Sequence, residues 1–360
     1  MSEKIILIEI CGSHDECIYA QAQVFKHLGY DVLIIASDDL SDRFTDYDID
    51  VELEYFSFSK NRLNNLSKLF KIKKLIKNVN PAHIQFNTAS NSLVMDLLFL
   101  LGKKYSYSGI IHSLKKLTEG TTQKIINRYI KKYFVLNDFL LDFIPKITSA
   151  HEFESFYTAS FPYNFDIHSR DDSIFKICIP GNVEYKRRDY LYLTELAKSP
   201  NLNPNVVFEI LGNSTHRYSC GNDLKEKVKH CDSSDRFIFH DNFIEPYKFH
   251  KNVQSSDLIM PLLHPNVEYY ESYLTNQISG TYNLSFAYRI PMLISKPFDI
   301  VEDIRNTAFF YDSIEECISQ INRIVNNKHL LRNEKFDDYI SNKLNLDTQA
   351  IKINDFLFKK

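Results

Sequence analysis

Short apolar runs alternate with longer amphipathic segments from the start of the chain. The first two runs, KIILIEI at 4–10 and DVLIIAS at 31–37, are almost entirely apolar, which is typical of strands buried on both faces of a parallel sheet. The segment between them has helical character and ends at Gly29, a residue suited to capping a helix C-terminus. A strand, a helix and a second buried strand in this order predict a doubly wound α/β sheet.

The same alternation continues through two halves of the chain. The first half has further predicted strands at 82–86, 108–113 and 132–137, with helices at 60–78, 91–102 and 122–131. The second half has predicted strands at 174–181, 205–212, 236–241 and 257–261, with helices at 187–198, 222–230, 246–253 and 280–290. Between them, 145–172 shows no clear period and is interpreted as a linker, while 312–358 predicts two or three amphipathic helices without strands.

We therefore expect an α/β fold of two Rossmann-like, doubly wound lobes facing a cleft. The predicted N-terminal lobe spans 1–165 and the predicted C-terminal lobe spans 166–330. The helices of 331–360 are expected to pack back towards the N-terminal lobe. A chain of 360 residues is too long for one ordinary core, so two domains also agree with its length.

The composition is that of a globular protein, with 44% hydrophobic and 25% charged residues. No apolar run approaches the roughly 18 to 20 residues of a membrane-spanning helix. The N-terminus lacks the small-residue cleavage site of a secretory signal. The six cysteines are scattered without the spacing of a zinc site, as expected for reduced thiols. These features predict a cytoplasmic protein.

Charge is segregated along the first lobe. Residues 1–58 hold 13 acidic and 3 basic side chains, whereas 59–132 hold 15 basic and 2 acidic ones. The basic helix at 60–77 also carries an apolar stripe, and we expect this stripe to pack into the lobe while the lysines are solvated. The lysines are also suited to an anionic membrane surface, which would make the protein peripheral to the membrane. No nucleic-acid recognition module is evident, so nucleic acid is not an expected partner.

Two segments of the second half are suited to binding an anion. In IPGNVEYKRRDY, Gly181 ends a strand, and Lys186, Arg187 and Arg188 open the next helix. Charged side chains beside helix-start amides bind a diphosphate by charge-assisted hydrogen bonds. The alternative for the three basic residues is a solvated helix face.

The second of these segments is ISGTYNLSFAYRIPMLIS. Ser279, Gly280 and Thr281 precede a helix that stops before Pro291. A glycine at this place lets the backbone approach a ligand closely, and exposed amides suit an anion. The alternative is an ordinary helix start capped by Ser279.

The segment CGSHDE follows the first strand, at the edge where open α/β sheets bind ligands. Gly12 and Ser13 permit close approach there, and His14 is a candidate general base with Asp15 as the residue that orients it. The alternative for His14 and Asp15 is a capping pair at a helix start. His112 ends a later strand at a similar edge and is a second candidate for binding.

The order of IPGNVEYKRRDY, EILGNS, DLIMPL and SGTYNLSFAYRIPML resembles the nucleotide-sugar half of GT-B glycosyltransferases, in particular glycosyltransferase family 4. The resemblance implies that the N-terminal lobe binds the acceptor, that the C-terminal lobe binds the donor, and that neither a metal nor another cofactor is needed. His112 resembles a histidine found at that place in many GT-B enzymes, so it is assigned to the acceptor with Gly12 and Ser13. The residues expected to contact the nucleotide-sugar are Gly181, Lys186, Arg187, Arg188, Gly212, Asn213, Ser279, Gly280 and Thr281.

Family 4 members usually carry a pair of glutamates that contact the sugar and the ribose. Alignment on Gly280 or on Pro291 places no glutamate at those positions. Glu268 and Glu271 lie just upstream in a tyrosine-rich loop, and Glu271 is the predicted replacement. The resemblance favours retention of anomeric configuration, which requires no strong protein base, whereas an inverting enzyme would use His14.

The sequence therefore predicts a metal-independent, hexosyltransferase-type glycosyltransferase. It would move a sugar from a nucleotide-sugar donor to a glycan or lipid-linked acceptor in surface polysaccharide assembly, at the inner membrane face. The alternatives are a sugar-nucleotide epimerase on the same fold and a non-catalytic, degenerate transferase acting as a partner subunit. Neither G-x-G-x-x-G nor G-x-x-x-x-G-K-[ST] occurs, which disfavours NAD-linked and P-loop proteins. The aspartates of TDYDID lie in an acidic connector and are interpreted as solvated charge.

Overall fold

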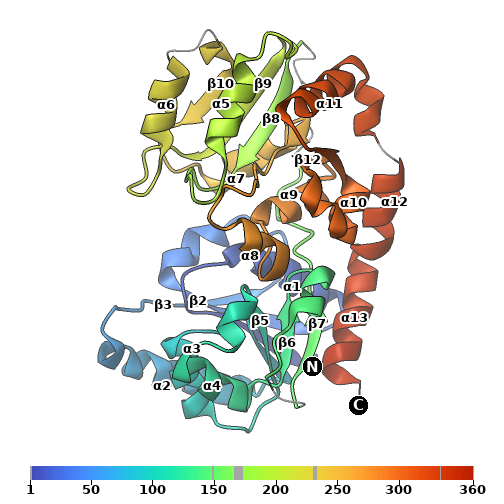
Figure 1. Ribbon diagram of the computed structural model, residues 1–360. Helices are drawn as coiled ribbons and strands as arrows, with labels where there is room; N and C mark the ends of the chain where they lie inside the picture. The colour runs from blue at the N-terminus through green and yellow to red at the C-terminus, as the bar shows by residue number, and fades with distance from the viewer. Residues whose placement is uncertain (1, 148–149, 166–172, 230–232, 333, 360) are drawn as a thin grey trace. The chain divides into compact units, whose positions relative to one another are not determined.

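The computed structural model describes residues 2–147, 150–165, 173–229, 233–332 and 334–359. The chain divides into two compact units, each with its own parallel sheet (Figure 1). Unit 1 comprises Met1–Pro162, Thr275–Ile278 and Leu344–Lys360, and unit 2 comprises Tyr163–Leu274 and Ser279–Lys343. The predicted doubly wound α/β class is confirmed for both units. Cys231, one of the six cysteines, and residues 166–172 of the expected linker lie outside the described residues.

Unit 1 contains a seven-stranded sheet in the order β3-β2-β1-β4-β5-β6-β7, and its strand pairs are parallel. Its strands are β1 (Lys4–Glu9), β2 (Asp31–Ser37), β3 (Glu52–Phe56), β4 (His83–Phe86), β5 (Tyr107–Ile111), β6 (Lys132–Val135) and β7 (Glu152–Ser155). Its helices are α1 (Ile18–His27), α2 (Leu66–Val79), α3 (Ser92–Leu101), α4 (Gly120–Tyr129) and α13 (Leu346–Phe358).

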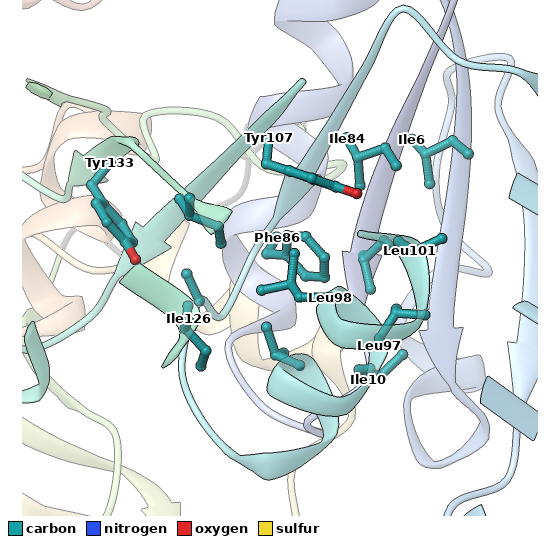
Figure 2. Packing of buried hydrophobic residues seen from close by; sticks show 14 of the residues in the cluster. Ile6, Ile10, Ile84, Phe86, Leu97, Leu98, Leu101, Tyr107, Ile126 and Tyr133 are labelled. Atoms are coloured by element: carbon teal, nitrogen blue, oxygen red, sulfur yellow. The ribbon is translucent and has the colours of Figure 1, made fainter. Parts of the chain in front are cut away.

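Alternate residues of β1 enter two different cores, as expected for a strand covered on both faces. Ile6 and Ile8 pack with α2, α3 and α4, whereas Ile5 and Leu7 pack with α1 and α13. Figure 2 shows the first of these cores, where α3 packs on β1 and β4 through Leu97, Leu98, Leu101, Ile6, Ile84 and Phe86. The two-sided burial explains why β1 is a continuous apolar run in the sequence.

The C-terminal helix α13 belongs to unit 1, as the predicted return of the chain requires. It packs beside α1 and buries Ala350, Ile353 and Leu357. The ammonium of Lys132 on β6 donates to the carbonyl of Phe356 at 2.7 Å, where the last carbonyls of a helix lack intrahelical partners. The preceding helix α12 (Glu334–Lys343) belongs to unit 2, so the chain re-enters unit 1 at Leu344.

Unit 2 contains a six-stranded sheet in the order β10-β9-β8-β11-β12-β13, also with parallel pairs. Its strands are β8 (Phe175–Pro180), β9 (Val206–Asn213), β10 (Phe237–His240), β11 (Leu258–Ile259), β12 (Met292–Ser295) and β13 (Ala308–Tyr311). The remaining helices are α5 (Tyr190–Lys198), α6 (Gly221–Lys229), α7 (Pro246–Gln254), α8 (Tyr270–Thr275), α9 (Gly280–Tyr288), α10 (Glu302–Thr307) and α11 (Ile314–Asn326).

Four strands, β3, β7, β12 and β13, were not predicted, and the first two of them lie at edges of the first sheet. β3 reads ELEYF and β7 reads EFES, so polar and apolar residues alternate and no continuous apolar run marks them. Such edge strands are covered on one side only. β7 lies inside the segment interpreted as a linker, so that interpretation is wrong for residues 152–155. β13 closes the second sheet with only four residues.

Helix α2 differs from its prediction, because it carries two apolar stripes and only one of them is buried. Leu69, Ile72 and Ile76 are fully buried, whereas Leu66 and Phe70 on the same helix are exposed. The expectation that the whole stripe packs into the lobe is therefore wrong. Within the described part of the chain, no helix combines the length and apolar character needed to cross a membrane.

Candidate functional site

A pocket of about 370 Å³ opens at the carboxyl edge of the second sheet. It lies where β8, β9 and β10 end, the edge at which open α/β sheets bind ligands. Its lining residues come from three strand ends and the start of α7: Gly181, Asn182, Val183, Glu184, Leu211, Gly212, Asn213, His216, Ser219, Phe243, Ile244 and Phe249. One wall is thus backbone and amide side chains, and another is apolar and aromatic.

Two glycines shape the backbone wall of this pocket. Gly181 adopts φ +108°, a conformation that other residues rarely adopt. A Cβ atom at Gly212 would lie 2.0 Å from the carbonyl oxygen of Gly181. The ends of β8 and β9 are therefore closer than any side chain at residue 212 allows, and residues of both strand ends line the pocket.

The basic turn after Gly181 contains three cationic side chains in different settings. Arg188 is buried, and its guanidinium donates to the carbonyl of Pro180, the residue before Gly181. Lys186 and Arg187 are partly exposed and lie 3.3 Å and 3.2 Å from the same carboxylate, that of Glu184. Arg188 therefore braces the turn, while Lys186 and Arg187 stay partly exposed beside Glu184, which lines the pocket although these two residues do not.

The loop after β11 is fixed against this basic turn. Asp189 caps α5 by accepting from the N–H of Tyr192 at 3.0 Å, and its other carboxylate oxygen lies 3.1 Å from Nδ1 of His264. Further along, the N–H of Tyr269 donates to the carbonyl of Lys186 at 3.2 Å, and the guanidinium of Arg187 lies over the Tyr269 ring. The tyrosine-rich loop is therefore a neighbour of the predicted phosphate ligands.

The two glutamates considered for the carboxylate role lie in this same loop region. Glu268 precedes α8 and Glu271 lies in its first turn, and both are exposed. Neither lines the pocket, whereas Glu184 does. Glu184 was not predicted as a site residue, although its position three residues before Arg187 favours an ion pair.

Helix α9 begins at Gly280, as predicted. The hydroxyl groups of Ser279 and Thr281 are buried and hydrogen-bonded to each other, and the Ser279 hydroxyl also accepts from the Thr281 N–H. Gly280 itself is exposed, and a Cβ atom added there meets nothing within 4 Å. What this helix start presents to a ligand is therefore the Gly280 backbone rather than the two hydroxyls.

Unit 1 has its own polar cluster at the carboxyl edge of its sheet. The buried carboxylate of Glu9, at the end of β1, accepts from the Asn87 side-chain amide at 2.7 Å and from the Thr88 hydroxyl at 2.6 Å. It also accepts from the Cys11 N–H at 2.8 Å. Burial raises the pKa of Glu9, and these hydrogen bonds partly offset that effect. Glu9 thus ties the loop after β1 to the loop after β4.

Asn87 also forms hydrogen bonds with both candidate histidines. Its side-chain amide donates to the carbonyl of His14 at 2.8 Å, and its own carbonyl accepts from Nε2 of His112 at 2.7 Å. The rings of His14 and His112 stack, with centroids 3.7 Å apart and planes within 9°. Because Nε2 of His112 donates, its Nδ1 is left as an acceptor.

The two stacked histidines have opposite acid–base character. Burial lowers the pKa of His112 to about 3, so this ring is neutral near pH 7. Burial also works to lower the pKa of His14, but the hydrogen bond and charge of Glu16 outweigh it, so the pKa of His14 is raised. His14 adopts a left-handed backbone conformation with φ 62°, which is strained for a residue with a side chain.

The carboxylate that orients His14 is Glu16, with Nδ1 and Oε1 3.3 Å apart, rather than Asp15 as expected. Asp15 opens the short 3-10 turn η1 (Asp15–Cys17) that leads into α1. Gly12 and Ser13, the other residues expected to contact an acceptor, are exposed in the loop before His14. Unit 1 thus brings together His14 and His112, which were singled out separately in the sequence, with Glu9, Glu16 and Asn87 as unpredicted partners.

No family model and no curated protein matches the chain. Solved structures do match it. A glycosyltransferase from Rickettsia africae ESF-5 is similar over 100% of both chains, with TM-score 0.69 and 15% identity. The Anabaena protein HepE, in complex with UDP and glucose, is similar over 99% of both chains, with TM-score 0.69 and 15% identity.

A putative UDP-N-acetylglucosamine 2-epimerase from Listeria monocytogenes is similar over 100% of this chain and 98% of its own, with TM-score 0.62 and 12% identity. At these identities the likeness shows the fold alone. The chain has the two-lobe α/β architecture of GT-B proteins, as the resemblance in its sequence implied.

Proposed function

We propose that the protein is a glycosyltransferase that takes its donor from a nucleotide-sugar bound in the unit 2 pocket. The observation that carries this proposal is the pocket wall, where Gly181 and Gly212 bring two strand ends together and the lining residue Glu184 pairs with Lys186 and Arg187. Peptide groups beside cationic side chains match the chemistry of a diphosphate. The similar fold of HepE, whose structure holds UDP and glucose, supports the same assignment.

The aromatic side of the pocket suits a nucleoside. Phe243 and Phe249 offer ring surface to a base, while Asn182, Asn213 and Ser219 supply polar groups. Glu184 is the carboxylate of the pocket and would accept from ribose hydroxyls, the role that the missing pair of glutamates leaves open. Lys186, Arg187 and the Gly280 backbone are assigned to the phosphates.

The acceptor is assigned to the polar edge of the first sheet. His112 is neutral and offers Nδ1 to a hydroxyl group, and Gly12 and Ser13 permit a glycan or lipid-linked acceptor to approach. The reaction proposed is hexosyl transfer without a metal, in surface polysaccharide assembly on the cytoplasmic side of a membrane. If the reaction inverts the anomeric carbon, His14 is the base that removes the acceptor proton.

The first prediction concerns the phosphates. Arg187→Ala should weaken binding of UDP by about 1.5 to 3 kcal/mol, since a hydrogen bond to a charged group is lost. Uridine, which has no phosphate, should bind as before. Calorimetric titration of both ligands checks this, with Arg323→Ala as control because that exposed arginine also contacts an aromatic ring, Phe309, in unit 2. Equal losses for uridine and UDP would exclude a phosphate contact.

The second prediction concerns His14 as a base. A base must be unprotonated, so kcat/KM should fall as the pH drops through the raised pKa of His14. Glu16→Gln removes the negative charge that raises this pKa and leaves at most a neutral hydrogen-bond acceptor, so the acid limb should move to lower pH. Asp15→Asn should move it in the same direction by less. If the pH midpoint of the acid limb is the same in Glu16→Gln as in wild type, His14 is excluded as the titrating group.

A sugar-nucleotide epimerase is the second candidate, because a putative enzyme of that kind shares the fold. An epimerase converts a UDP-sugar without an acceptor, whereas a transferase releases UDP when an acceptor is supplied. Proton NMR of UDP-N-acetylglucosamine incubated with the protein alone separates the two. A new sugar epimer would support the epimerase and exclude the transferase assignment.

A further inference from the structure

The first feature is an apolar stripe that unit 1 leaves on its surface. Leu63 in the 3-10 turn η3 (Arg62–Asn65) is 74% exposed, and Phe70 on α2 is 54% exposed. Leu66 lies between them at helical spacing and is 39% exposed. Phe99 on α3, the helix that packs beside α2, is 73% exposed. Large apolar side chains grouped in this way mark an interaction surface rather than a solvated face.

The second feature is the charge around this stripe. Lys74 and Lys77 follow Phe70 by four and seven residues, so they lie on the same face of α2. Lys71 is exposed beside them. Within the described residues, none of the α2 lysines forms an ion pair, whereas Arg62 at the start of this segment pairs with Asp96 at 2.6 Å. The exposed stripe is thus bordered by lysines that have no ion pair with any described residue.

We propose that this surface docks on an anionic lipid bilayer. The lipid-docking face consists of Leu63, Leu66, Phe70, Phe99, Lys71, Lys74 and Lys77. Its apolar side chains would enter the boundary between headgroups and acyl chains, and its lysines would meet the lipid phosphates. An anionic bilayer matches both parts of this face, because its headgroups complement the lysines and its hydrocarbon complements the apolar side chains. The inference does not depend on the proposed glycosyl transfer.

RNA is a weaker occupant of the same face. It would use the lysines, but single strands bind through aromatic stacking platforms, and Leu63 and Leu66 offer none. Exposed lysine side chains are also well solvated by water, so the lysines by themselves do not indicate a partner. The aliphatic residues are the part of the face that only a bilayer or an apolar partner uses, so the experiment varies them separately from the charge.

Vesicle flotation tests the proposal with the full chain. The protein should bind vesicles of phosphatidylglycerol and phosphatidylcholine at low salt and bind pure phosphatidylcholine vesicles poorly. Lys74→Gln with Lys77→Gln should lower binding by about 30-fold, because each lysine near an anionic surface contributes about 1 kcal/mol. The matched control is Lys248→Gln with Lys251→Gln, an exposed pair of equal spacing on α7, which should bind like wild type.

The aliphatic part of the face is tested by Leu63→Ser with Leu66→Ser. Binding should fall at least about tenfold even at low salt, since the lost burial is not electrostatic. Both side chains are exposed, so the variant should fold as wild type does, which circular dichroism checks. Ile351→Ser on α13 is the control, because Ile351 is 62% exposed on another helix of the same unit.

A fluorescent probe reports insertion directly, because the chain contains no tryptophan. Phe70→Trp should shift its emission to the blue on anionic vesicles and should be quenched by brominated acyl chains, whereas Ile351→Trp should show neither effect. The proposal is overturned if wild type ignores anionic vesicles at low salt, if the serine variant binds undiminished, or if the emission of the Phe70→Trp variant does not change. Binding that is lost equally in the control variants, or RNA binding that outcompetes vesicles, also overturns it.

Discussion

Gly280→Val is expected to lower kcat/KM for the nucleotide-sugar at least about a hundredfold, which corresponds to about 2.7 kcal/mol of transition-state stabilisation. The valine side chain would cover the exposed backbone at the start of α9, where the proposal assigns the donor phosphates. The protein has room for it, since a Cβ atom at this residue meets nothing within 4 Å. Valine is not a poorer helix former than glycine, so the melting temperature should hardly change.

Initial rates with the preferred donor, together with thermal unfolding, measure both parts of this expectation. Donor hydrolysis without an acceptor serves as the rate if the acceptor has not been found. Near-normal turnover in Gly280→Val would show that the start of α9 does not contact the donor. A large fall in melting temperature would show instead that the glycine serves packing.

Gly212→Ala is expected to damage the second unit itself. The new methyl group would lie 2.0 Å from the Gly181 carbonyl oxygen and 3.1 Å from a methyl group of Val183, so the ends of β8 and β9 must separate. Overpacking of this kind costs about 1 to 3 kcal/mol of unfolding free energy. Because both strand ends line the pocket, UDP binding should be lost as well.

Gly280→Ala is the matched control, because it adds the same methyl group to open space. Urea unfolding and hydrogen exchange of the β8 and β9 amides should separate the two variants. If Gly212→Ala is as stable as wild type and binds UDP equally well, the close approach of the two strand ends does not build the nucleotide site.

How well the sequence predicts each strand depends on whether both faces of that strand are buried. β1 and β2 are buried on both faces, so their composition alone identifies them. β3 and β7 lie at the edges of the first sheet and mix charged with apolar residues, which no longer distinguishes a strand from a connector. Whether such a segment becomes an edge strand or a connector depends on its tertiary surroundings, which the sequence does not reveal.

The candidate site shows the same limit at the level of side chains. The sequence indicated a basic turn after Gly181, but only the folded turn shows that Arg188 donates to Pro180 while Arg187 stays partly exposed. It indicated His14, but adjacent carboxylates at 15 and 16 are equivalent until the η1 turn directs Glu16 towards the ring. Phe243 and Phe249 enter the pocket from the loop and helix after β10, which no motif links to Gly181.

The exposed stripe of α2 was missed for a related reason. Leu66, Leu69 and Phe70 form one periodic pattern in the sequence, although Leu69 is buried and the other two are exposed. Periodicity identifies the helix but does not say how wide a strip the sheet covers. The position of α3 beside α2 settles that question in the folded unit.

The most direct test of the central claim is a calorimetric titration of the wild-type protein with UDP, GDP and CMP in turn. We expect micromolar binding of at least one of these nucleotides, with a strong preference over its nucleoside, and loss of that binding in Gly212→Ala. If none of the three nucleotides binds in this range, the unit 2 pocket is not a site for these donors, and the protein shares the fold of the transferases without the donor binding proposed for it.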